Sequence, residues 1–229
     1  MTKTAAPMTS GSIWKQMTFF AMPIFLGNLF QQLYNTVDSL IVGNFLGSSA
    51  LAAVSSSGSL IFMLIGFLSG ISAGAGVIVA RFFGAGDEKN LQRAVHTTVA
   101  FGLVAGVLMT GVGVALSPQI LRWMDTPESV MRESVTYLQI YFAGSLGFVM
   151  YNVLVGILQA VGDSRHPLYY LIVSSVINLV LDLLFITGFH TGVGGAAVAT
   201  VISQIVSALL CFWQLLRTKE SYGLKIRKI

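Results

Sequence analysis

Six long apolar segments constrain this chain more than any other feature of its sequence. A helix needs about 20 consecutive, mostly apolar residues to cross the hydrocarbon core of a bilayer. The segments that meet this requirement are residues 17–41, 52–79, 94–116, 135–161, 168–189 and 193–213. Their apolar runs are continuous and do not alternate with period two, which excludes a transmembrane β-barrel. The sequence therefore predicts an all-α membrane protein, a single domain of 229 residues built as a six-transmembrane-helix bundle.

The composition excludes several other classes of protein. Only 10% of the residues are charged, whereas soluble domains carry about a quarter, so a soluble enzyme and a nucleic-acid-binding module are excluded. Cys211 is the single cysteine, which leaves no disulfide framework. His96, His166 and His190 are scattered, without metal-ligand spacing. We therefore expect no cofactor, no catalytic residues and no nucleic-acid partner.

The distribution of Lys and Arg predicts the orientation of the chain. Eleven of the 13 lie in the N-terminal segment, the second and fourth loops, and the tail 217–229. Only Arg122 and Arg132 lie in the third loop. Basic residues concentrate on the cytoplasmic side of membrane proteins, so both termini are predicted to be cytoplasmic. The basic tail is expected to lie near anionic lipid headgroups.

Two carboxylates interrupt the apolar segments. Asp38 lies near the outer end of the first span and Asp182 lies within the fifth. A carboxylate at the centre of a bilayer costs about 2.5–3.5 kcal/mol on insertion scales. Such residues usually face a cavity or a partner, so both are candidates for function.

Other polar residues share helical faces with these carboxylates. The spacing of three and four residues groups Asn28, Gln31 and Asn35 with Asp38, Ser174 and Asn178 with Asp182, and Ser203 and Ser207 with Thr200. Tyr34 lies one turn before Asp38. Because these stripes would leave polar groups unsatisfied in lipid, we expect them to converge on a wet cavity. Asn152, in the fourth span, either joins that cavity or bonds a neighbouring helix.

These oxygen-bearing side chains suit two kinds of chemistry. An aspartate in a poorly hydrated cavity can bind and release a proton. Alternatively, Asp38, Asp182, Asn178 and Thr200 can replace the hydration shell of Na⁺, the one metal ion that the sequence suggests. The residues alone leave this choice open. Pro23 removes a helix hydrogen bond inside the first span and permits a bend.

Glycines at every fourth position predict close helix packing. They are Gly66, Gly70 and Gly74 in the second span and Gly102 and Gly106 in the third. Such small-residue ladders let neighbouring helix backbones approach each other in a membrane.

Five motifs in order resemble a known family. They are PIFLGNLFQQLYNTVDSLIVGNFLG at 23–47, residues 80–86 followed by Asp87, LQAVGDSRHP at 158–167, INLVLDLLFI at 177–186, and GVGGAAVAT at 192–200. Together they resemble the N-terminal lobe of the multidrug and toxic compound extrusion (MATE) family. The resemblance covers essentially the whole chain. It implies a multi-pass transporter of a bacterial cell membrane, exporting organic cations and amphipathic toxins in exchange for H⁺ or Na⁺.

The resemblance also implies roles for individual residues. Asp38 and Asp182 match the acidic residues of the family's ion site. Asn178, Thr200 and Tyr34 match the polar residues around it, and the site approaches the backbone at Ala196. Pro23 matches the proline at which the first span bends.

The chain departs from the family in length. MATE proteins have two six-span lobes and work by alternating access between them, whereas this sequence supplies one lobe. We expect either that a second lobe is missing or that two copies pair as a homodimer.

Two other functions compete with this interpretation. A lipid-linked precursor flippase of related fold would line its cavity with basic residues, but the intramembrane charges here are acidic. An intramembrane aspartyl protease could use Asp38 and Asp182 as a dyad. However, Asp182 does not lie in the Gly-x-Gly-Asp motif that is typical of such proteases.

Overall fold

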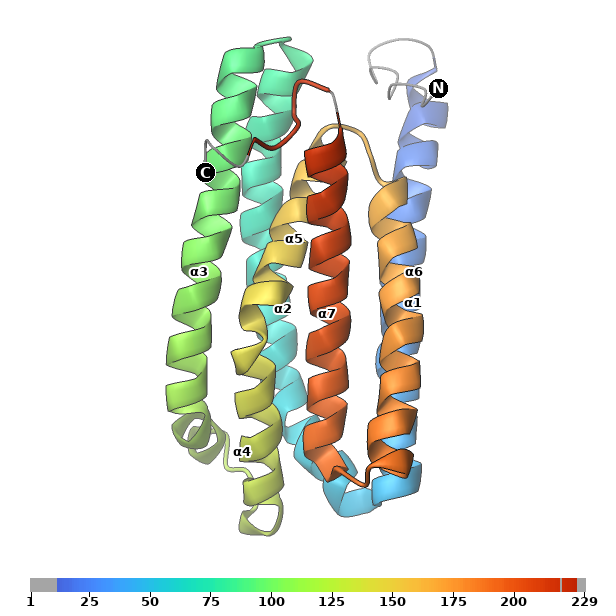
Figure 1. Ribbon diagram of the computed structural model, residues 1–229, viewed down its shortest axis with the longest axis vertical. Helices are drawn as coiled ribbons and strands as arrows, with labels where there is room; N and C mark the ends of the chain where they lie inside the picture. The colour runs from blue at the N-terminus through green and yellow to red at the C-terminus, as the bar shows by residue number, and fades with distance from the viewer. Residues whose placement is uncertain (1–11, 219, 226–229) are drawn as a thin grey trace.

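A bundle of long helices forms the whole described structure (Figure 1). The computed structural model describes residues 12–218 and 220–225, and no strand occurs in these ranges. The helices are α1 (Ile13–Leu46), α2 (Ser48–Gly84), α3 (Glu88–Trp123), α4 (Glu128–Ala143), α5 (Ser145–Ala160), α6 (Arg165–Leu183), the π-helix η1 (Leu184–Gly188) and α7 (Gly192–Arg217). The predicted all-helical fold is confirmed, and the helices extend beyond the predicted spans at most ends.

The helices run up and down along the long axis of the bundle. The start of α1 and the end of α7 lie at the same end, together with the α2–α3 and α5–α6 turns (Figure 1). The α1–α2, α3–α4 and η1–α7 connections lie at the opposite end. This arrangement is what an even number of crossings produces. The assignment of the first end to the cytoplasm stays a prediction.

The predicted continuous fourth span is wrong in one respect, because the chain breaks at Gly144. The break separates α4 from α5, which are bent by 49° relative to each other. Glycine is required here by a close approach of α7, since a Cβ at Gly144 would lie 2.4 Å from both Cγ atoms of Val201. The sequence signal was a single glycine in an apolar run, which does not distinguish a break from ordinary packing.

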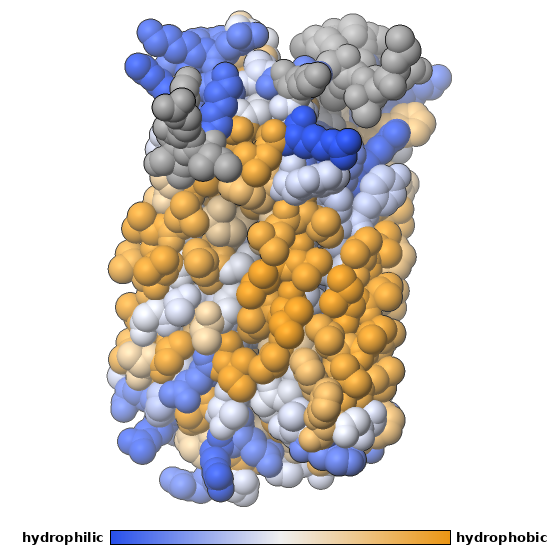
Figure 2. Space-filling model, in the orientation of Figure 1, coloured by the Kyte–Doolittle hydropathy of each residue, from blue (hydrophilic) through white to orange (hydrophobic). Residues whose placement is uncertain are grey.

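Length and composition mark most of these helices as membrane-crossing. In the described ranges α2, α3, α6 with η1, and α7 qualify, and the bent pair α4–α5 qualifies as a fifth span. Helix α1 has ample length at 34 residues, but amides and Asp38 make it less apolar. It packs along α6, and its role as the sixth span stays a prediction. Figure 2 shows an apolar middle band between hydrophilic ends on the face in view.

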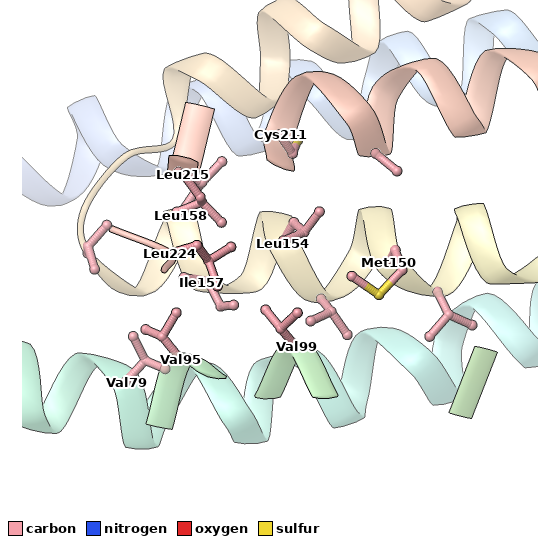
Figure 3. Packing of buried hydrophobic residues seen from close by; sticks show 14 of the residues in the cluster. Val79, Val95, Val99, Met150, Leu154, Ile157, Leu158, Cys211, Leu215 and Leu224 are labelled. Atoms are coloured by element: carbon pink, nitrogen blue, oxygen red, sulfur yellow. The ribbon is translucent and has the colours of Figure 1, made fainter. Parts of the chain in front are cut away.

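Helices α3, α5 and α7 pack around the largest apolar core. Figure 3 shows this cluster, which includes Val95, Val99, Leu154, Leu158, Cys211 and Leu215. Close packing by glycine is confirmed in α3, where a Cβ at Gly106 would lie 2.6 Å from Leu146. In α2 the expected close approach is not seen within the chain, because a Cβ at Gly66, Gly70 or Gly74 would meet no atom within 4 Å.

The described part of the C-terminal tail folds back onto the bundle. Leu224 is buried in the core cluster (Figure 3), and its N–H donates to the Leu215 carbonyl at 2.9 Å. Gln92 Nε2 donates to the Gly223 carbonyl at 3.0 Å, and the ring of Tyr222 lies edge-on to that of Phe83. Residues 220–225 thus pack on protein through Tyr222 and Leu224, and the expected proximity of the tail to headgroups stays a prediction. Lys219, Arg227 and Lys228 lie outside the described residues.

Candidate functional site

Helices α6 and α7 bring their polar stripes together inside the bundle, in the half nearer the η1–α7 connection. Asn178 donates its amide N–H to Asp182 Oδ2 at 2.9 Å, and its amide oxygen accepts from the Thr200 backbone N–H at 3.3 Å. The opposite amide orientation offers only a 3.5 Å contact to Thr200 Oγ1, so the first one satisfies more groups. All three side chains are buried. The stripes of these two helices thus avoid lipid, as the sequence predicts.

Helix α1 brings a second carboxylate to this cluster. The carboxyl groups of Asp38 and Asp182 interact directly with each other. Asp38 is 8% exposed and Asp182 is fully buried. The Oδ1 atom of each has no hydrogen-bond partner among the described residues. The structure therefore joins the two candidates, which are 144 positions apart in the sequence.

Two further predicted residues complete this cluster, which we call the carboxylate site. The Tyr34 side chain interacts with that of Thr200. Thr200 Oγ1 donates to the Ala196 carbonyl at 3.1 Å, so this carbonyl of the α7 backbone lies beside the Thr200 hydroxyl. Among the described residues, the atoms of this site that could bind an ion are the oxygens and the amide group of Asn178. Such ligands suit a proton or a hard cation.

Two tyrosines of α4 lie beside the carboxylate site and were missed in the sequence. Tyr137 is buried and interacts electrostatically with Asp38, Asp182 and Tyr34. Its ring stacks on that of Tyr141 with centroids 6.5 Å apart. Their spacing of four residues was a usable signal, since it places both on one face of the fourth span.

A separate cavity lies between α1, α2, α5 and α6. Its volume is about 510 Å³, and its lining includes the predicted residues Asn28, Gln31 and Asn152, with Pro23 beside them. No charged side chain lines it in the described structure. Gln31 precedes Asp38 by seven residues, so the cavity lies about 10 Å from the carboxylate site along α1.

The remaining predicted lining residues lie elsewhere. Asn35 is exposed, with its Nδ2 atom 3.5 Å from Gln32 Oε1. Ser174 and Ser203 are buried, and their hydroxyls donate within their own helices to the carbonyls of Leu171 and Thr200. The predicted single cavity is thus divided in the structure into the carboxylate site and the larger hollow. Helix α1 continues through Pro23.

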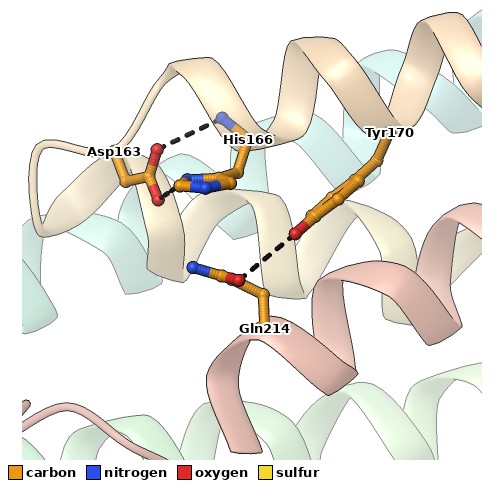
Figure 4. A network of polar contacts seen from close by, with 4 residues as sticks. All are labelled: Asp163, His166, Tyr170 and Gln214. Carbon is orange, nitrogen blue, oxygen red and sulfur yellow. Dashed lines mark hydrogen bonds and ion pairs between the residues drawn. The ribbon is translucent and has the colours of Figure 1, made fainter. Parts of the chain in front are cut away.

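A polar network at the α5–α6 turn is distinct from both. Asp163 Oδ2 lies 2.6 Å from His166 Nδ1, and the Tyr170 hydroxyl donates to Gln214 Oε1 at 3.3 Å (Figure 4). The network ties the start of α6 to the turn before it and to α7. Its contacts are structural and do not reach the carboxylate site in the described residues.

Comparison with known proteins finds relatives in both sequence and structure. The MatE family model matches residues 23–184. The probable multidrug resistance protein YoeA of Bacillus subtilis is 37% identical over 213 residues, and YpnP of the same organism is 34% identical over 215. A crystal structure of MATE in the bent conformation superposes with a TM-score of 0.88 at 27% identity over 96% of this chain.

The chain spans about half the length of these proteins. The matches cover 91% and 94% of this chain but only 46% and 48% of the two Bacillus proteins, and 49% of the crystallised chain. The bundle therefore corresponds to one half of a longer transporter fold. The members of the matching family are transporters and not enzymes, which argues against the protease interpretation. The chain belongs to the MATE family of multidrug efflux transporters.

Proposed function

We propose that this chain is the ion-coupling lobe of an exporter in the inner membrane of a bacterium. It exchanges H⁺ or Na⁺ for organic cations or amphipathic drugs. The single observation that carries the proposal is the buried, interacting pair of Asp38 and Asp182. The names of the relatives, multidrug resistance proteins, support the class of substrate.

The electrostatics of the pair support ion binding. Two ionised carboxylates at this separation repel each other strongly in a site that excludes water. A proton shared between them, or a cation held by both, removes that repulsion. The free Oδ1 atoms of Asp38 and Asp182 provide the lone pairs for such an ion. Occupancy of the pair would therefore follow the transmembrane gradient of the ion.

The neighbouring residues would complete the ion's surroundings. Thr200 and Tyr34 contribute hydroxyl groups, and Ala196 contributes a backbone carbonyl that Thr200 now occupies. Asn178 can turn either amide atom toward Asp182, the N–H in the present orientation and the oxygen after rotation about its terminal torsion. The same residues can thus hydrogen-bond to Asp182 when no cation is bound and can coordinate a cation when one is bound.

Coupling requires that ion and substrate bias two states of the transporter differently. We propose that ion release and binding change the bend of α1 at Pro23, whose missing N–H weakens the helix there. Pro23, Asn28 and Gln31 line the cavity on the same helix that carries Asp38. Asn152 completes its wall from α5. A change in α1 would therefore alter both the ion site and the cavity.

Alternating access needs a second lobe opposite this one. We propose that the partner is either a covalent second half or another copy of this chain. The uncovered glycines of α2 leave room for such an approach. A dimer after mild solubilisation supports pairing of two copies, and a uniformly monomeric, correctly inserted chain supports a missing half.

Efflux of ethidium from proteoliposomes would test the proposed function. A pH gradient and a Na⁺ gradient are imposed separately on vesicles that hold the chain. Export under one of them identifies the ion, and Asp182→Asn should abolish it while insertion stays intact. Glu133→Gln is the matched control, because Glu133 is an exposed carboxylate of α4. Gradient-driven export that survives Asp182→Asn would contradict the assignment.

A second readout does not depend on the partner lobe. Dicyclohexylcarbodiimide modifies protonated carboxyl groups in apolar surroundings, and mass spectrometry locates the modified residue. Modification of Asp38 or Asp182 should depend on pH and, for a Na⁺ site, should be suppressed by Na⁺. Modification that responds to neither ion would overturn the proposed ion site.

A further inference from the structure

One contact links the carboxylate site to the break in the fourth span. Thr200 belongs to the site, and the next residue of α7, Val201, packs against Gly144. A Cβ at Gly144 would lie 2.4 Å from both Cγ atoms of Val201 and 2.8 Å from its Cβ. The two segments therefore pack too closely for a Cβ at Gly144, one residue away from an ion-site hydroxyl.

The other side of this contact leads back to the same site. Gly144 ends the helix that carries Tyr141 and Tyr137, three and seven residues earlier. The Gly144 N–H lies 3.2 Å from the carbonyls of both Ile140 and Tyr141, which fixes the last turn of α4. Tyr137 in turn interacts electrostatically with Asp38. The contact thus lies between the two helices that flank the carboxylates.

We infer that Gly144 and Val201 are positioning residues for the carboxylate site. Their contact sets the position of Thr200 relative to Asn178 and the position of Tyr137 relative to Asp38. This inference rests on the proposed function, because it assigns the contact a part in ion binding. Neither residue touches the ion in this scheme, and both act through the residues beside them.

The Val201 side chain and helix α7 are stiff enough to transmit a displacement at Gly144 to Thr200. Valine is β-branched and holds one χ1 rotamer in a helix, so its side chain cannot swing away from an added atom. Thr200 and Val201 share a peptide unit, and a helix moves as a rigid body over one turn. Relieving a 2.4 Å contact to an ordinary 3.4 Å therefore displaces Thr200 by a comparable amount. The 3.3 Å bond from its N–H to Asn178 is already long and would break.

The start of α5, just beyond the break, supplies a matched control against the same helix α7. A Cβ at Gly147 would lie 2.7 Å from Cγ1 of Ile205. Gly147→Ala therefore introduces the same atom against the next turn of α7. Ile205 follows Thr200 by five residues, however, and no residue of the carboxylate site adjoins it. The pair of variants separates positioning of the site from packing of the interface.

The test measures carbodiimide modification of Asp38 and Asp182 in the full chain in lipid vesicles, as a function of pH and of Na⁺. We expect Gly144→Ala to weaken ion binding about tenfold, since a displacement of about 1 Å at a site can cost up to roughly a hundredfold. Gly147→Ala should change the midpoint less than about twofold. Gly144→Ala combined with Val201→Ala should restore the wild-type midpoint, because the smaller side chain accommodates the new methyl group.

Val201→Ala alone keeps the test decisive if Gly144→Ala does not fold. It removes the contact without a clash and should weaken ion binding by about threefold, within the same limit. Equal midpoints for the Gly144 and Gly147 variants, or failure of Val201→Ala to shift or rescue, would overturn the inference. A wild-type chain whose modification ignores both ions would overturn the proposed function instead, and the inference with it.

Discussion

Asp87 and Asp163 occupy equivalent positions in two turns at the same end of the bundle. Asp87 Oδ1 accepts from the backbone N–H of Asn90 at 3.1 Å, and Asp163 Oδ1 accepts from that of His166 at 3.2 Å. The second oxygen of each meets the side chain of the same residue at 2.6 Å. Each aspartate thus satisfies a free N–H at the start of the next helix.

The backbones of the two turns also match. Gly86 and Gly162 precede the aspartates with φ of 67° and 88°. The N–H of each aspartate donates to a carbonyl five residues earlier, to Phe82 at 3.1 Å and to Leu158 at 2.9 Å. This is the helix-ending motif that a left-handed glycine permits. The Gly-Asp pairs in the sequence therefore encode one turn used twice.

Removal of the charge at Asp87 should lower stability in a pH-dependent way. The hydrogen bonds from the Asn90 backbone and side chain hold the pKa of Asp87 below its usual value. Its contribution is therefore present above the pKa of the unfolded chain and is lost as the pH falls through the lower folded pKa. We expect Asp87→Asn to unfold at a lower temperature than the parent at pH 7. The gap should close in strongly acidic buffer, and a constant gap would contradict this explanation.

Substitution of Gly86 should be costly because of its backbone conformation. A Cβ there would meet no atom within 4 Å, so only the positive φ opposes alanine. We expect Gly86→Ala to destabilise by about 1–2 kcal/mol, measured by denaturant unfolding in detergent. Gly74→Ala is the control, since Gly74 has equal space but lies inside α2. Its effect should be neutral or slightly stabilising, and equal losses for the two would refute the argument.

Close packing of α3 against α4 depends on Gly113. A Cβ there would lie 2.1 Å from the ring of Phe142, whereas Gly111 on the same helix has open space. Gly113→Ala should cost about 1–3 kcal/mol through overpacking, and Gly111→Ala should not. Thermal unfolding of the detergent-solubilised variants would show this difference. Partial recovery in Gly113→Ala with Phe142→Leu would locate the clash.

The folded-back tail should contribute to stability through Leu224. Its side chain is 5% exposed and belongs to the main core. Leu224→Ala should destabilise by about 2–3 kcal/mol and should expose the tail to limited proteolysis. Lys225→Ala removes an exposed side chain from the same segment and should have little effect. Identical cleavage of the two variants would show that the tail does not dock in solution.

The carboxylate site shows how far the sequence could be interpreted. Asp38 and Asp182 were identifiable because charge inside an apolar run is expensive, and the helical spacing grouped Asn178 with Asp182 correctly. The same spacing grouped Asn35 with Asp38, although Asn35 is exposed. Positions three and seven residues apart share a face only approximately. The side on which a helix meets its neighbours depends on contacts distant in the sequence.

The sequence by itself determined the helices, because long apolar runs have one stable form in a bilayer. It also determined the turns at Gly86 and Gly162, where local backbone chemistry suffices. Only the tertiary structure decided that Asp38 meets Asp182, that Tyr137 joins them and that the fourth span breaks at Gly144. These features depend on the approach of α1, α4 and α7 to one another, and no local pattern records how closely helices pack.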